Sequence, residues 1–383
     1  MRFSFTSILF SSSLVVSSAL VLGGCAAHRH EPTEAEWVSP LGRDHPLVGR
    51  VYDVSAARFV TRVELDAAAA SADILLLGEQ HDNIDHHRLQ QSLLDALVAR
   101  GLRPAVAFEQ LDLEDQAAVD RVLAQEPGST GSSANPVGGG VFRNRAQAAA
   151  AATALAAAVE WDKSGWPSFE QYRPVFETAI AAGLPIRATN LSRSSLMRVL
   201  GHAHGSHTPM ARTGSPRTAA EAGSTPAIAV PLPNRLRDRM AADIRDSHCG
   251  HADEGMTAMM IEAQRLRDST MASAVIAATT ERSPDVSKRA GKSADHAVVL
   301  VCGFGHARRD YGVPLYLRAM ASSRRSLSIA LLEAVAGAES PADYERAFHT
   351  DELPFDYLIF TPRTDDEDPC EKFRGQLERM KKE

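Results

Sequence analysis

The chain has 383 residues, of which 44% are hydrophobic, and its 41 basic and 48 acidic side chains give a net charge of −7. This hydrophobic fraction is enough for a sizeable core and excludes a globally disordered chain. The acidic balance argues against a nucleic-acid-binding protein, which would show a basic field. The length is compatible with a single α/β domain that carries insertions.

Residues 1–24 have the pattern of a secretory signal. They contain one charge, Arg2, followed by an apolar run interrupted by serines, and they end in Leu-Gly-Gly before Cys25. This arrangement is typical of an exported protein. The segment Leu22-Gly23-Gly24-Cys25 resembles the bacterial lipobox. This resemblance implies that Cys25 is acylated and attaches the chain to a membrane. An ordinary signal peptide followed by a chance cysteine is the alternative.

Ala26 follows Cys25, with no aspartate there to indicate retention in the inner membrane. By the resemblance to bacterial lipoproteins, we expect an outer-membrane lipoprotein that faces the periplasm. Residues 25–50, with His28, His30 and several prolines, are expected to be a tether between lipid and domain. The other cysteines, Cys249, Cys302 and Cys370, are dispersed and predict no disulfide framework.

Short apolar runs recur after residue 50 and predict the strands of a mostly parallel sheet. Their apolar character is continuous, as in strands that are buried on both faces. Asn83 is a predicted N-cap for a helix over residues 84–101, and strand, helix and strand in this order indicate an α/β fold with helices flanking the sheet. The predicted strands are 74–77, 105–108, 186–189, 297–302, 327–332 and 357–360, with a weaker one at 51–54.

Two intervals, about 110–184 and 191–295, are longer than a normal crossover between strands. The first contains an alanine-dense helix expected over 146–159, and the second a helix expected from Asn234 to Thr280. We expect these insertions to form a smaller all-helical subdomain of a domain that spans 51–363. Segments 205–233 and 282–294 should be flexible loops, and residues 364–383 a charged, solvated C-terminal tail.

Two Gly-x-x-His motifs are the most informative features of the sequence. One runs from Gly78 to His81 and the other from Gly303 to His306, each at the end of a predicted strand. Both should therefore lie at the carboxyl edge of the sheet, where open α/β folds bind ligands. Glu79, within the first motif, and Glu109, after the strand at 105–108, belong to the same edge, as do Asn190 and Glu333.

These motifs, in this order, resemble the ChaN-like haem-binding lipoproteins, which belong to a superfamily that includes Tiki-type metalloproteases. The resemblance covers about 73–363, apart from the low-complexity loops, and implies a haem-binding protein of the cell envelope. The sequence leaves open whether the protein is also an enzyme, and a binding protein is favoured. It also implies haem or iron uptake, a homodimer around haem, and a haem receptor or transporter as a further partner. The other matching segments are 82–88, 108–110, 190–193, 247–251, 264–268 with 271–272, and 303–314.

Haem requires an apolar slot, one or two axial donors to iron, and groups that hold its propionates. Tyrosinate, histidine, methionine and cysteine are the usual axial donors. Tyr172 and Tyr311 lie near motif residues, and a structural role is the alternative for each. His248 and His251 are three residues apart and would share one face of a helix.

The same helical segment supplies other groups that haem would need. Met256, Met259 and Met260 would suit a flexible apolar slot. Cys249 is a further possible iron donor, with a reduced, uninvolved thiol as the simpler interpretation. Arg265 and Arg267 are candidates for propionates, or for salt bridges within the helix.

Metal-dependent hydrolysis is the competing hypothesis, taken from the other branch of the superfamily. His81 and His306 would bind a divalent metal such as Zn or Mn, and Glu79 or Glu109 would act as a further ligand or as general base. His86 and His87 fall on the next helix, where one of the pair is expected to face solvent.

Overall fold

The computed structural model describes residues 37–124, 144–203, 230–280, 297–368, 370, 371 and 374. These residues all belong to one compact unit, Pro32–Glu383. The predicted signal segment and the lipidation site Cys25 lie outside the described residues, as do the predicted loop 282–294 and most of 205–233. No helix within the described ranges is long and apolar enough to cross a membrane.

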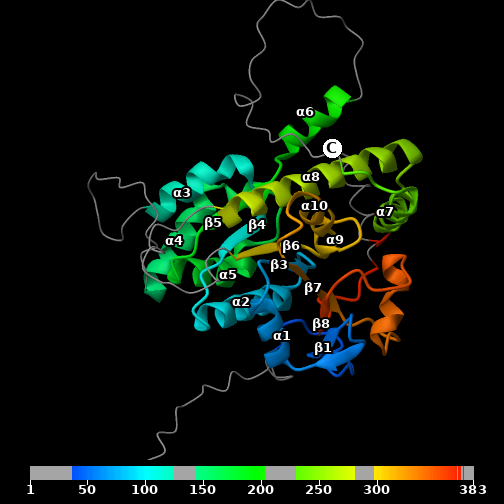
Figure 1. Cartoon of the computed structure of the whole chain (residues 1–383), viewed down its shortest axis with the longest axis horizontal. Coiled ribbons are helices and arrows are strands. Elements are labelled where there is room, and N and C mark those ends of the chain that lie inside the picture. The colour runs from blue at the N-terminus through cyan, green and yellow to red at the C-terminus, as the bar shows by residue number, and fades with distance from the viewer. Residues whose placement is uncertain are drawn as a thin grey trace, which may run out of the picture. The chain divides into compact units, whose positions relative to one another are not determined.

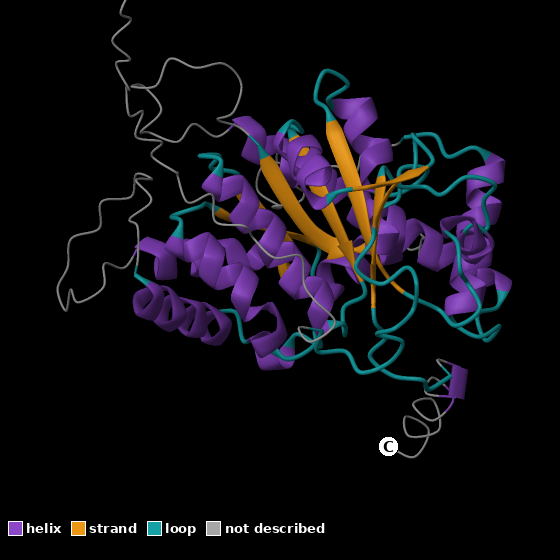
Figure 2. Ribbon diagram, turned by 90° about the horizontal axis from the view of Figure 1, so that it is seen from below, coloured by secondary structure: helices purple, strands orange, loops and turns teal. Residues whose placement is uncertain are grey.

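The described part of the chain is built around an eight-stranded sheet in the order β2-β1-β8-β7-β3-β6-β4-β5 (Figures 1 and 2). The strands from β8 to β5 in that order run parallel, and β1 is antiparallel to β2 and β8. The predicted α/β class is confirmed, and only the short β2 was not predicted. The strands are β1 Val51–Asp53, β2 Arg58–Val60, β3 Ile74–Glu79, β4 Ala105–Asp112, β5 Ile186–Asn190, β6 Val298–Gly303, β7 Ser326–Glu333 and β8 Tyr357–Thr361.

Helices cover both faces of the sheet, as Figure 2 shows. Alternate residues of β3 explain why: Leu75 and Leu77 pack in one core with α2, α4 and α5, whereas Ile74 and Leu76 pack in a second core with α8 and α10. Strands buried on both sides need apolar residues at successive positions. The helices are α1 Arg62–Ala70, α2 Ile84–Ala99, α3 Gln116–Ala124, α4 Arg145–Ala158, α5 Phe169–Ala181, α6 Arg193–Ala203, α7 Asn234–Ser247, α8 Glu254–Thr280, α9 Phe304–Ala307 and α10 Val313–Met320.

Residues 37–50 pack against the domain, although they were expected to be part of the tether. Trp37 is 6% exposed and Leu47 is 1% exposed. The backbone N–H groups of Val38 and Ser39 donate to Asp85 in the first turn of α2, at 3.0 and 2.8 Å. These apolar contacts and charge-assisted bonds fix the segment, so any tether ends before Trp37.

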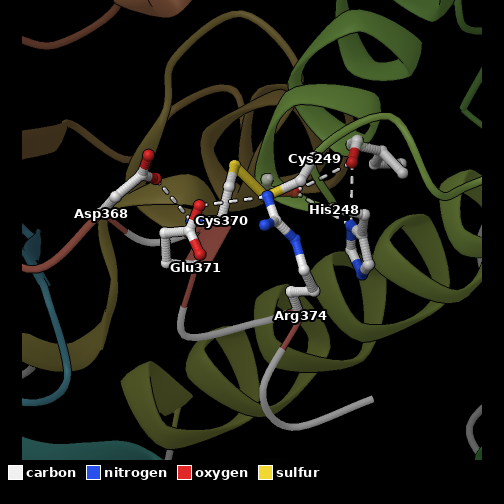
Figure 3. The surroundings of a disulfide bond; sticks show 8 residues. His248, Cys249, Asp368, Cys370, Glu371 and Arg374 are labelled. Atoms are coloured by element: carbon white, nitrogen blue, oxygen red, sulfur yellow. Dashed lines mark hydrogen bonds and ion pairs between the residues drawn. A yellow bond between two sulfur atoms is a disulfide. The ribbon is translucent and has the colours of Figure 1, made fainter. Parts of the chain in front are cut away.

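The helix predicted over 234–280 is divided into α7 and α8. Cys249 and Gly250 adopt left-handed conformations, with φ of 55° and 73°, which end α7. Cys249 forms a disulfide with Cys370, 121 residues later, which joins this turn to the C-terminal segment (Figure 3). The expectations of a free Cys249 and of no disulfide were therefore wrong, because the fold brings together two cysteines that are remote in sequence.

Candidate ligand site at the carboxyl edge of the sheet

The two Gly-x-x-His motifs lie side by side, because β3 and β6 are neighbours and Glu79 is paired in register with Gly303. Gly78 permits this close approach: a Cβ there would come within 2.8 Å of the Cα of Phe304. Gly303 does the same for His81, whose Nε2 would be 3.0 Å from an added Cβ. The glycines thus bring the polar ends of β3, β4 and β6 together.

Glu79 is the centre of the first polar group at this edge and is 1% exposed. Its Oε1 lies 2.9 Å from His81 Nδ1 and accepts bonds from Gln110 Nε2 at 2.9 Å and the Tyr172 hydroxyl at 2.6 Å. Its Oε2 accepts from Gln90 Nε2 at 2.6 Å. Burial alone would raise the pKa of Glu79, but the histidines beside it hold that pKa well below its usual range. The carboxylate is therefore a fixed negative charge.

His86 and His87 are both fully buried, so the expectation that one of them faces solvent was wrong. His86 Nδ1 accepts from the Gln80 backbone at 2.9 Å, and burial lowers the pKa of His86 to about 3. His87 stacks on Tyr172, with ring centroids 4.0 Å apart, and its Nε2 is 3.4 Å from Glu79 Oε2. The pair is enclosed because α2 is covered by both the sheet and α5.

Glu109, His306 and Asp268 form the second polar group. Glu109 accepts from the Gly303 N–H at 2.7 Å, and its Oε1 lies 3.1 Å from His306 Nε2. The other ring nitrogen of His306 is 2.6 Å from Asp268. Burial opposes a charge on His306, but the two carboxylates raise the pKa of His306 to about 10, so the ring is protonated at neutral pH. His306 lowers the pKa of Glu109 to about 2 against the effect of burial.

His81 is the partly accessible member of this edge, with 36% of its side chain exposed. Burial lowers the pKa of His81, but the bond from Glu79 and the charge of Glu109 outweigh burial and raise it. The edge of the ring meets Trp166, with centroids 4.9 Å apart. Because Glu79 occupies Nδ1, the free Nε2 can exchange a proton with a molecule at the edge.

The structure places several predicted site residues in a different region, around α7. The Tyr311 hydroxyl donates to Asp243, and the ring packs against Met240 and Ile261. His248 is the C-cap of α7, with Nδ1 2.8 Å from the Ile244 carbonyl. His251 follows the left-handed Gly250, so these two histidines do not share a helix face.

The two arginines predicted for propionates differ in their surroundings. Arg265 is bonded to Glu262 and to the Val230 carbonyl, the latter at 2.6 Å. The Nε atoms of both arginines are buried and have no hydrogen-bond partner in the described part of the chain. Asp268, the next residue, was not predicted as a site residue, although it belongs to the segment 264–268 that carried the resemblance.

A cavity of about 860 Å³ lies beside these groups, at the ends of β4 and β5. This volume is within the range of small-molecule and cofactor sites. Its walls come from α6 and α8, which lie side by side in Figure 1, and from residues 159–166. Apolar side chains and polar or charged side chains contribute to the lining in about equal numbers. The lining includes Gln110, Asp112, Asp115, Trp161, Lys163, Trp166, Asn190, Leu191, Arg193, Leu196, Met197, Leu200, Met259, Met260 and Arg267.

The lining combines apolar side chains with three basic residues, Lys163, Arg193 and Arg267, and three acidic ones, Asp112, Asp115 and Glu160. Met259 and Met260, expected in an apolar slot, are both on the wall, together with Trp161 and Trp166. The unpartnered Nε of Arg267 offers a buried donor for an anionic group. No group of three or more His, Cys, Asp or Glu side chains in the described ranges is arranged to bind a metal ion.

The fold is thus α/β, with a cavity at the carboxyl ends of β4 and β5, the edge at which open α/β sheets bind ligands. The chain belongs to the family described as haem-binding uptake, Tiki superfamily, ChaN, whose profile matches residues 65–317. No curated protein sequence matches the chain.

Solved structures with similar folds include ChaN of Campylobacter jejuni with cofacially bound haem. That protein is 18% identical, with a TM-score of 0.52, and the match covers 81% of this chain and 95% of that one. The type III effector HopBA1 is 12% identical, with a TM-score of 0.34 over 78% of this chain and 92% of its own. The erythromycin esterase EreC is 12% identical, with a TM-score of 0.39 over 84% and 99%.

Proposed function

We propose that this protein is an envelope lipoprotein that binds haem non-covalently in the cavity at the ends of β4 and β5 and serves haem or iron uptake. The observation that carries the proposal is the cavity itself, in which tryptophan, leucine and methionine side chains accompany a buried arginine Nε without a partner. Such walls would bury the macrocycle, and the arginine would bind a propionate. Membership of a haem-binding family supports the same ligand.

The cellular context of the proposal depends on the sequence and on one structural feature. The lipobox-like segment supports acylation of Cys25 and an outer-membrane location that faces the periplasm. The disulfide between Cys249 and Cys370 supports folding in an oxidising compartment such as the periplasm. A homodimer around haem and a haem receptor or transporter complete the proposed set of partners.

Haemin titration of residues 32–383, the unit that contains every described residue, tests the proposal. We expect a saturable shift of the Soret band. Arg267→Gln should weaken affinity by roughly 10- to 150-fold, because one charge-assisted bond is worth roughly 1.5–3 kcal/mol. Arg265→Gln is the matched control on α8, since its terminal nitrogens already bind Glu262 and Val230. A spectrum that does not saturate, or equal losses in both variants, would contradict this assignment.

Hydrolysis is a second candidate, and one observation favours it. Glu79 holds Nδ1 of His81, so that Nε2 faces Gly303 beside Glu109, as in a histidine general base oriented by a carboxylate. If the reaction needs Zn or Mn, elemental analysis should find the metal, and His81→Ala and His306→Ala should lose it. A metal-free chain without activity on ester or peptide substrates would remove this candidate.

A further inference from the structure

We infer that the disulfide between Cys249 and Cys370 is a site of thiol–disulfide exchange, and that its reduction by a dithiol weakens the contacts of α7 and α8 with the second Gly-x-x-His motif. In this exchange the dithiol loses two electrons and two protons and forms its own disulfide, while Cys249 and Cys370 become thiols. The consequence for haem affinity rests on the proposed function, whereas the exchange does not depend on it.

Both cysteines of the disulfide lie at the surface of the described chain. Each is partly exposed, and the neighbouring residues Gly250 and Glu371 are exposed. The third described cysteine, Cys302, is fully buried in β6. A thiolate must reach a sulfur atom to attack it, so exposed disulfides exchange more readily than buried ones. The described chain therefore presents a reducible pair at its surface and a protected thiol in its core.

The disulfide joins the C-terminal segment to the end of α7 (Figure 3). Among the described residues from Asp368 onward, the hydrogen bonds and ion pairs remain within that segment. Asp368 accepts from the backbone N–H groups of Cys370 at 2.8 Å and Glu371 at 3.0 Å. Glu371 pairs with Arg374 at 3.1 Å. Reduction therefore removes the covalent bond that fixes this segment to the turn.

The other half of the disulfide stabilises the turn between α7 and α8. Cys249 has a φ of 55°, in the left-handed region that is unfavourable for a residue with a Cβ. The N–H of Cys249 donates to the carbonyl of Asp246 at 2.9 Å, and that of Gly250 to the carbonyl of Arg245 at 2.8 Å. Without the covalent bond, hydrogen bonds alone must keep a strained backbone closed, so the turn opens more often.

The helix α7 contacts the chain directly after the second Gly-x-x-His motif. Arg308 is 2% exposed and donates to Asp243 at 2.8 Å, six residues before Cys249. Arg239, also on α7, donates to Asp310 at 2.8 Å. Buried ion pairs offset the cost of desolvation only when their geometry is good. A shift of α7 therefore weakens both pairs and with them the position of residues 308–310.

The helix α8, on the other side of the same turn, contacts the motif itself. Gln264 and Asp268 lie 2.9 and 2.6 Å from Nδ1 of His306. Met259 and Arg267 of this helix also line the cavity. The two helices that meet at the disulfide thus both position the second motif, and one of them forms a wall of the cavity. The redox state of the disulfide is in this way coupled to the geometry of the ligand site.

Alkylation of the folded, full-length protein tests the exchange. Dithiothreitol, a dithiol, is added without denaturant, iodoacetamide follows, and peptide mass spectrometry identifies each modified cysteine. We expect Cys249 and Cys370 to be alkylated while Cys302 is not, which shows that the core stays folded. Modification of the pair only in denaturant, or only together with Cys302, overturns the inference.

Backbone amide chemical shifts, measured by NMR, test whether reduction changes the ligand site. Because these shifts report the native state, a lower global stability alone does not move them. Reduction should shift the amides of α7 and of residues 304–310, whereas those of α2, which packs in the other core, should keep their positions. Changes confined to residues 246–251 and 368–374 would overturn the inference.

Haemin titration measures the consequence for the ligand after the reductant is removed. Reduced, alkylated protein should bind haemin about tenfold more weakly than oxidised protein, within the usual range of coupling between two sites. A double variant with Cys249→Ser and Cys370→Ser should match it and should not respond to dithiothreitol. Equal affinities in the oxidised and reduced states overturn the inference. Oxidised protein that binds no haemin refutes the proposed function instead, and the alkylation and NMR results then decide the inference.

Discussion

Glu79→Gln is expected to destabilise the carboxyl edge of the sheet strongly. Oε1 of Glu79 is hydrogen-bonded to His81, Gln110 and Tyr172, and Oε2 accepts a hydrogen bond from Gln90. Glutamine keeps a single acceptor oxygen, so its amide N–H₂ must face at least one of these donors. An unpaired buried group costs about 1–3 kcal/mol, and a broken buried charge network about 3–5 kcal/mol. We therefore expect the free energy of unfolding to fall by about 3–5 kcal/mol.

Urea denaturation at pH 7, followed by circular dichroism, measures this loss. Glu170→Gln on α5 is the matched control, because that carboxylate is exposed and pairs only with Arg173 among the ion pairs of the described chain; its denaturation midpoint should not change. The pKa of His81, measured by NMR titration, should also fall, since the bond from Glu79 raises it. A Glu79→Gln protein within about 1 kcal/mol of wild type would show that Glu79 is not a buried, fully bonded charge.

Three further predictions concern stability. The two carboxylates raise the pKa of His306 from its usual 6.5 to about 10 in the folded protein. Its contribution to the free energy of unfolding is therefore complete below about pH 6.5 and is lost as pH rises toward 10. His306→Gln should flatten the decline of the denaturation midpoint at alkaline pH, and an unchanged slope would contradict the assignment. A reductant should lower the free energy of unfolding of the wild type by up to about 4–5 kcal/mol, because the disulfide restricts a loop of 121 residues in the unfolded chain. The reductant should not affect a double variant that carries Cys249→Ser and Cys370→Ser. Gly312→Ala should lower the free energy of unfolding by more than about 3 kcal/mol, because a Cβ there meets the carbonyl oxygens of His306 and Arg308. Gly305→Ala is the control and should be tolerated, because the space around its Cβ is open. Equal melting temperatures of the two variants would refute the steric argument.

The sequence was most informative where the structure depends on local pattern. Continuous apolar runs predicted the six parallel strands of the described sheet, and Asn83 caps α2 as expected, accepting from the N–H groups of Asp85 and His86. The three-residue β2 escaped prediction because Arg58–Val60 is too short to show a periodicity.

Features that depend on contacts between distant segments were missed. Pairing of Cys249 with Cys370 requires the C-terminal segment to return to the turn between α7 and α8. Burial of both His86 and His87 depends on α5, which covers the face of α2 that was expected to meet solvent. The position of Arg267 on the cavity wall has no sequence signal that separates it from Arg265 two residues earlier, whose Nε is likewise without a partner among the described residues.

The strand order places residues 37–50 and the cavity on different flanks of the sheet. Leu41 pairs with Arg363, just after β8, whereas the cavity opens at the ends of β4 and β5. In the order β8-β7-β3-β6-β4, four strand spacings separate these flanks, a distance of about 20 Å. Residues 37–50, the first that the structure describes, therefore lie on a different flank of the sheet from the cavity and are not part of its lining. If the proposed haem uptake holds, a receptor or a second copy would meet the cavity on a flank that residues 37–50 leave uncovered.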